Sequence, residues 1–93
     1  MTEQKIVHRV DPGRVAWRAA GDEVVVLDTT DSIYFVLDPA GALLWQRLLA
    51  GATSTELVTA LVETATVDRE RARADVAAFL DDLGGHGLLL QRP

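Results

Sequence analysis

Apolar residues in the first part of the chain follow the two-residue period of β-strands. Val15, Trp17 and Ala19 recur at every second position, as expected for a strand with one buried face. Two further apolar stretches, residues 23–28 and 32–37, follow after short turns that contain Gly, Asp and Thr. This order predicts three antiparallel strands joined as a meander.

From residue 38 onward the apolar residues follow the period of helices instead. Asp38 is a good cap for free backbone amides, and Pro39 suits the first helical position because its missing N–H leaves no hydrogen bond unmade. The first helix is therefore predicted from Pro39 to about Ala50, where Gly51 ends it.

Two more helices are predicted in the second half of the chain. Thr53 and Glu56 have the spacing of a capping box and open the second helix. Asp68 caps the third helix, which the glycine pair 84–85 is expected to end, and residues 88–90 form an extended tail that packs back on the core. The fold class predicted from these elements is α+β.

The third predicted strand is apolar on both of its faces. Ile33, Phe35 and Leu37 share one face, and Tyr34 and Val36 share the other. Three helices of this length can cover only one face of the sheet. The second face is covered either by the ends of the chain or by a partner, and the free ladder of this edge strand could accept an added strand.

Residues 1–13 are predicted to be a flexible arm, which ends in the turn sequence Asp11-Pro12-Gly13, and residues 14–90 a single domain. The chain has a net charge of −5, from 14 acidic and 9 basic residues, which disfavours nucleic acid as a partner. No apolar run reaches the length of a membrane span, no secretion signal is present, and cysteine is absent. We therefore expect a cytoplasmic protein with no membrane partner.

Candidate catalytic groups are few and poorly placed. Serine occurs only as Ser32 and Ser54 and histidine only as His8 and His86, without the spacing of a triad. The sequence contains neither a glycine-rich phosphate loop nor a cluster of metal ligands. We predict no catalytic residue, no metal site, no cofactor and no enzymatic activity.

A series of short motifs runs in order along residues 14–90. The motifs are GDEVVVLD at 21–28, IYFVLD at 33–38, GALLW at 41–45, TEL at 55–57, DV at 75–76, FL at 79–80, Leu83 and GLL at 87–89. Together they resemble the PqqD-like domain, also called the RiPP recognition element. The resemblance implies a winged-helix-like fold, a three-stranded antiparallel sheet followed by three helices, that binds the leader segment of a ribosomally made precursor peptide.

In that family the leader adds as a further strand beside the third strand and lies against the third helix. Carried over to this sequence, the resemblance implies a set of peptide-binding residues on these two elements. They are Ile33, Tyr34, Phe35, Val36, Arg69, Ala72, Arg73, Val76 and Phe79. Arg69 and Arg73 flank one side of the inward stripe of the third helix and Phe79 the other, so either flank could face the peptide.

The resemblance also implies a pathway. A free-standing domain of this kind is similar to those of lasso-peptide biosynthesis, which present the precursor to a leader peptidase (a transglutaminase-like cysteine protease), with a cyclase acting afterwards. Leaders of that class carry a Tyr-x-x-Pro element. Two other interpretations stay open: a PQQ-type peptide chaperone for a radical-SAM enzyme, and a winged-helix DNA-binding protein.

Overall fold

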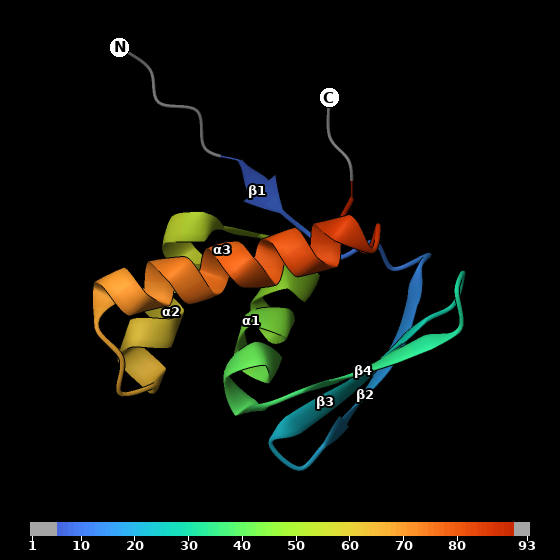
Figure 1. Cartoon of the computed structure of the whole chain (residues 1–93), viewed down its shortest axis with the longest axis horizontal. Helices are drawn as coiled ribbons and strands as arrows, with labels where there is room; N and C mark the ends of the chain where they lie inside the picture. The colour runs from blue at the N-terminus through green and yellow to red at the C-terminus, as the bar shows by residue number, and fades with distance from the viewer. Residues whose placement is uncertain (1–5, 91–93) are drawn as a thin grey trace.

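The computed structural model describes residues 6–90 and confirms the predicted α+β fold (Figure 1). An antiparallel sheet has the order β2 (Val15–Ala20), β3 (Glu23–Asp28), β4 (Ile33–Leu37). Three helices follow it: α1 (Pro39–Ala50), α2 (Ser54–Thr64) and α3 (Arg69–Gly85). Two strands that the sequence did not predict, β1 (Val7–His8) and β5 (Ala52–Thr53), pair antiparallel in a separate small sheet.

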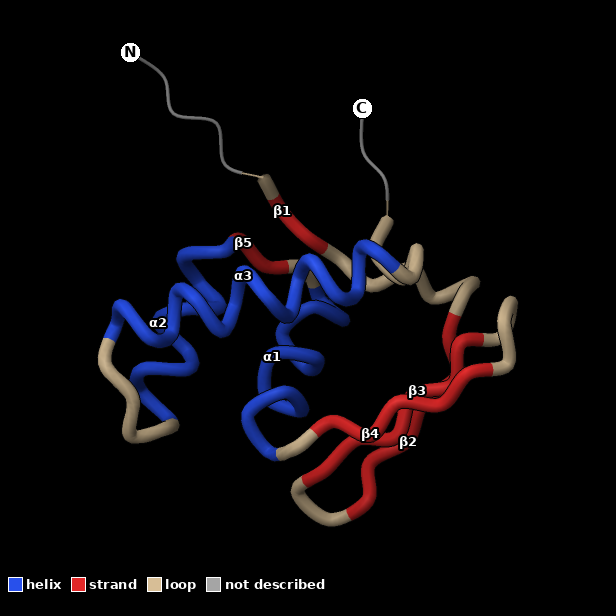
Figure 2. The backbone as a smooth tube through the Cα atoms, viewed as in Figure 1, coloured by secondary structure: helices blue, strands red, loops and turns tan. Residues whose placement is uncertain are grey.

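The helices are arranged so that α1 lies between the sheet and α2 (Figure 2). α3 crosses above α1, with its first turns beside α2 and its last turns nearer the strands (Figure 1). The core forms where these elements meet. Its largest fully buried side chains are Trp45, Leu48, Leu57, Leu88, Val24, Val26 and Val76.

The strand register assigns each residue of the sheet to one face. Trp17, Val26 and Phe35 are cross-strand partners, and because Val26 is buried this row faces the helices. The outer face carries the alternate positions. Tyr34 and Val36 there are 69% and 66% exposed, so no part of the described chain covers this face next to β4.

The ends of the described chain pack against each other rather than on the sheet. Val10 is buried and forms a β-bridge with Leu89, and the Leu90 amide donates to the Arg9 carbonyl. The arm was predicted to be flexible over residues 1–13. The flexibility stays a prediction, while in the structure β1 pairs with β5 and Val10 is buried; residues 1–5 lie outside the described part.

The predicted helix starts are confirmed. Asp38 and Asp68 accept hydrogen bonds from the third residue beyond each, and Thr53 and Glu56 form a complete capping box. The start of α2 therefore satisfies two backbone amides that the helix itself leaves free.

The Thr53→Ala variant should lower the free energy of unfolding by about 1 kcal/mol, because Thr53 Oγ1 accepts from the Glu56 amide at 3.1 Å. Urea denaturation followed by circular dichroism measures this change. Thr59→Ala, which removes the same group from the middle of α2 where it caps nothing, is the control and should change stability by less than about 0.5 kcal/mol. Equal losses in the two variants would contradict the assigned role of the cap.

The predicted end of α3 is wrong by two residues. The helix continues through Gly84 and ends at Gly85, and the amide of the cap residue His86 donates to the carbonyl of Asp82. The glycines are exposed and nothing crowds their α-carbons. The chain instead turns out of the helix at Gly87, which has a φ of 75° that favours glycine.

Candidate functional site

The free edge of β4 is the first feature of the candidate site. β4 pairs with β3 on one side, and within residues 6–90 no strand pairs with its other side. The unpaired backbone groups of this edge are hydrogen-bond donors and acceptors for an extended peptide. The described parts of the arm and of the tail do not occupy this edge, since they pair with β5 and with each other.

One flank of α3 reaches this edge. The ring of Phe35 on β4 and the ring of His86 meet edge to face with centroids 4.7 Å apart. A methyl group on Gly41, just after β4, would lie 3.5 Å from the Phe79 ring. Phe79 and His86 are both half-buried and are seven residues apart, so they share one helix face. This flank and the edge of β4 form what we call the β4-edge site.

The sequence analysis did not include His86 among the site residues. With the helix predicted to end at the glycine pair 84–85, His86 would have no fixed face. Because α3 extends to Gly85, His86 continues the face of Phe79. The seven-residue spacing was a usable signal, but the glycine pair concealed it.

The outer face of the sheet adds an exposed apolar surface next to the same edge. A hollow of about 320 Å³ is lined by Ala16, Trp17, Arg18, Val25, Leu27 and Tyr34. Trp17 also borders this hollow and is 39% exposed, although its ring lies on the helix side of the sheet and packs edge to face on buried Trp45. Side chains of a strand added at β4 would alternate between this outer face and the flank of α3.

The structure brings together only part of the predicted set of peptide-binding residues. Ile33, Tyr34 and Val36 are exposed on β4, and Phe35 and Phe79 are half-buried beside them.

Ala72 and Val76, which also belong to the predicted set, are buried. Their exposed fractions are 0% and 1%, and Val76 lines the hollow between α3 and α2.

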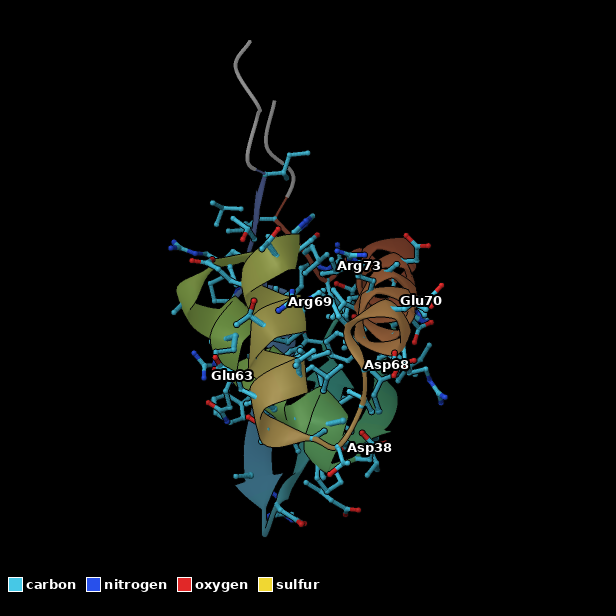
Figure 3. All side chains as sticks on the ribbon, turned by 90° about the vertical axis from the view of Figure 1, so that its left-hand side faces the viewer. Asp38, Glu63, Asp68, Arg69, Glu70 and Arg73 are labelled. Atoms are coloured by element: carbon cyan, nitrogen blue, oxygen red, sulfur yellow. The ribbon has the colours of Figure 1, made fainter. Side chains whose placement is uncertain are left out.

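Arg69 and Arg73 lie elsewhere on α3. Both side chains are exposed and line a hollow between α3 and α2, together with Val58 and Ala77. Figure 3 shows both on the side of α3 that is turned to α2. The flank of α3 that faces β4 is thus the one with Phe79, an alternative that the sequence left open.

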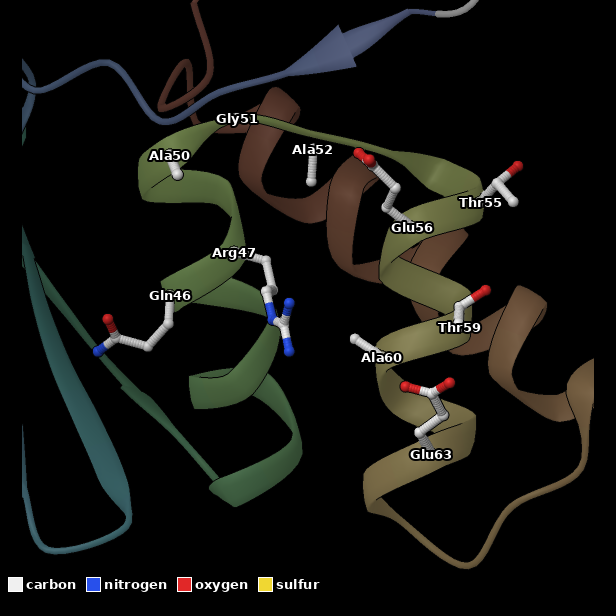
Figure 4. A pocket seen from close by; sticks show the side chains of 10 residues that line it. All are labelled: Gln46, Arg47, Ala50, Gly51, Ala52, Thr55, Glu56, Thr59, Ala60 and Glu63. Carbon is white, nitrogen blue, oxygen red and sulfur yellow. The ribbon is translucent and has the colours of Figure 1, made fainter.

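A larger hollow of about 440 Å³ lies between α1 and α2 (Figure 4). Small residues such as Ala52 and Ala60 point into it, and Arg47, Glu56 and Glu63 carry its charges. The Glu56 carboxylate already accepts from the Thr53 amide at 2.9 Å. This hollow has no counterpart in the predicted site.

Residues 6–90 contain no group of three or more His, Cys, Asp or Glu side chains placed to hold a metal ion. None of the helices in this range has the length and apolar character that crossing a bilayer requires.

The fold and its open edge define a small α+β domain with a peptide-sized site beside one strand. Residues 23–89 match the model of the family described as coenzyme PQQ synthesis protein D (PqqD). The chain belongs to this PqqD family, which confirms the resemblance drawn from its motifs. Among curated proteins, no sequence matches the chain.

Two solved structures are similar to the chain over nearly its full length. One is TbiB1 in complex with the TbiA(beta) leader peptide, with 30% identity, a TM-score of 0.81, and coverage of 91% of this chain and 98% of that one. The other is a lasso peptide synthetase B1 complexed with the leader peptide, with 28% identity, a TM-score of 0.77, and coverage of 90% and 98%. Both are domains of this fold bound to a leader peptide.

Proposed function

We propose that this protein is a RiPP recognition element of lasso-peptide biosynthesis, which binds the leader peptide of a precursor by strand addition at β4. The observation that carries the proposal is the unpaired edge of β4 in a PqqD-family chain. The two similar structures, both in complex with leader peptides, support the same ligand class.

The chemistry of the β4-edge site fits such a ligand. Backbone hydrogen bonds contribute only about 0.5–1.5 kcal/mol each, and ordering a flexible peptide opposes them. Contacts with apolar side chains must therefore provide much of the affinity. Phe35 and Phe79 offer apolar surface on the helix side, and Tyr34 and Val36 offer it on the outer face.

The proposed binding residues are accordingly a revised set. Ile33, Tyr34, Phe35, Val36 and Phe79 remain from the sequence analysis, and His86 is added because it packs on Phe35. Ala72 and Val76 support the site only from the core. Arg69 and Arg73 are left out because they face α2.

We propose that the protein acts without catalysis in the cytoplasm and presents the bound precursor to a separate leader peptidase, after which a cyclase acts. A PQQ-type chaperone is the second candidate, and the description of the matching family favours it. The gene neighbours distinguish the two, since a transglutaminase-like protease gene accompanies the first and a radical-SAM enzyme gene the second.

Hydrogen exchange tests strand addition directly. The probe is a synthetic leader peptide of the precursor that we expect to be encoded next to this protein. When it binds, amides of Ile33–Leu37 that exchange fast in the free protein should become protected at least tenfold, because the added strand bonds to them. Amides of β2, at the opposite edge of the sheet, are the internal control. Saturable binding with no new protection in β4 would contradict the proposed mode.

The absence of catalysis is tested with the full-length precursor. After incubation with this chain alone, mass spectrometry should show an unchanged precursor mass, and trimming should begin only when the leader peptidase is added. A trimmed product formed by the purified chain alone, and equally by its Val36→Asp variant, would point to a contaminating protease. Trimming lost in that variant would overturn the non-catalytic role.

A further inference from the structure

The hollow between α2 and α3 has a composition unlike the rest of the molecule. Its volume is about 250 Å³, and its walls are Ser54, Thr55, Val58, Arg69, Arg73, Val76 and Ala77. No acidic residue belongs to these described walls, although the whole chain carries 14 acids against 9 bases. A local basic surface in an acidic protein indicates a ligand of opposite charge.

The two arginines are available to such a ligand. Among residues 6–90 the one ion pair joins Arg71 to Asp75 at 3.3 Å, and neither Arg69 nor Arg73 takes part in one. Both are exposed, so their guanidinium groups keep all of their donors for a ligand.

The surroundings of the arginines add polar and apolar contacts. The hydroxyls of Ser54 and Thr55 stand on the opposite wall, and Ser54 Oγ lies 3.4 Å from His8 Nε2. At the start of α2 the backbone amides of Thr53 and Glu56 are already bonded within the capping box. The hydroxyls and the guanidinium groups are therefore the donors available to a ligand. Val58 and Ala77 provide apolar surface for the stem of a side chain.

We propose that this hollow is a docking site for an acidic segment of a protein partner, which places two carboxylates on Arg69 and Arg73. One turn of helix separates the arginines, about 6 Å along the axis. Alternate residues of an extended chain stand about 6.6 Å apart on one face. A Glu-x-Glu segment therefore matches the two guanidinium groups, which bind carboxylates through planar paired hydrogen bonds.

This surface is separate from the β4-edge site. Arg69 and Arg73 lie at the α2 end of α3, whereas Phe79 and His86 face β4 from the other flank. The two sites can then be occupied together, so the protein can hold a peptide at β4 while its partner docks on α2 and α3.

The test uses the ¹⁵N-labelled full chain and the peptide Ac-Gly-Glu-Ser-Glu-Gly-NH₂. Its addition at constant ionic strength should shift the amide signals of Ser54 and Thr55 and the side-chain signals of Arg69 and Arg73, with saturation in the low millimolar range. Replacing one glutamate of the peptide by glutamine should weaken binding about threefold to fivefold, as expected when one exposed ion pair is lost. Inorganic phosphate at the same charge concentration should give no saturable shift.

Charge-matched variants of the protein complete the experiment. Arg69→Gln and Arg73→Gln should each weaken binding of the glutamate peptide at least threefold, and the double variant should abolish saturation. Arg71→Gln removes the same charge from an arginine that is paired with Asp75 and does not line the hollow, and it should bind as the wild type does.

Binding of the leader peptide at β4 should be unchanged in the three single variants and in the double variant, which separates this inference from the proposed function. If the Arg71 variant lost as much affinity for the glutamate peptide as the Arg69 and Arg73 variants, the effect would come from net charge alone. That result would overturn the site. Saturable shifts with phosphate alone would overturn a protein partner.

Discussion

The Val36→Asp variant should bind the leader peptide 10- to 100-fold more weakly than the wild type. Val36 lies at the free edge of β4 with 66% of its surface exposed, so a bound strand would cover an aspartate there. Removing a carboxylate from water without a partner is costly, and a loss of this size corresponds to about 1.4–2.8 kcal/mol. Fluorescence anisotropy with a labelled leader peptide measures the dissociation constant.

The matched control is Ala20→Asp. Ala20 is exposed on β2 and belongs to the outer face, since its cross-strand partner Glu23 is two residues before Val25, and it does not line the hollow there. The variant thus introduces the same charge on the same face, two strands from the free edge. Affinity should change less than threefold. Equal affinities of the Val36 variant and the wild type would mean that the peptide binds elsewhere.

The Val76→Glu variant should lose the folded structure rather than only the bound peptide. Val76 is 1% exposed and points from α3 into the core, so a glutamate there would be buried without a partner. The expected cost of at least about 3 kcal/mol is a large fraction of the 5–15 kcal/mol that stabilises a typical domain. Circular dichroism with urea should show a much lower midpoint or no cooperative transition.

Ala78→Glu is the control for this variant. Ala78 is two residues further along α3 and exposed, so its variant should unfold within about 0.5 kcal/mol of the wild type. The sequence analysis placed Val76 among the peptide-binding residues, whereas its burial makes loss of the folded structure the expected result. A fully folded Val76 variant would mean that α3 packs differently in solution.

Local signals in the sequence were sufficient for most of the secondary structure. The strand pattern around Val26 and the caps at Asp38, Thr53 and Asp68 predicted elements that the structure confirms within about two residues. These signals depend on near neighbours along the chain, such as the amide three residues after a cap. Where the deciding contact was distant, the sequence did not predict it. Val10 pairs with Leu89, which joins the N-terminal segment to the C-terminal tail. β1 pairs with β5, which joins the N-terminal segment to the start of α2.

The sequence by itself determined that the strand of residues 33–37 is apolar on both faces. It thus determined that Tyr34 and Val36 form an apolar surface on the face that the helices cannot bury. That inference requires only the two-residue period of a strand. It also determined the family, because the ordered motifs are local patterns.

Only the tertiary structure decided which flank of α3 faces β4. On a helical wheel Arg73 and Phe79 are equivalent candidates, since both border the buried stripe of Ala72 and Val76. The packing of α3 on α2 turns the arginines toward α2 and the flank of Phe79 and His86 toward the strand. The period of a helix fixes the angles between its side chains around the helix axis. It does not determine on which side of the helix the sheet and the other helices pack.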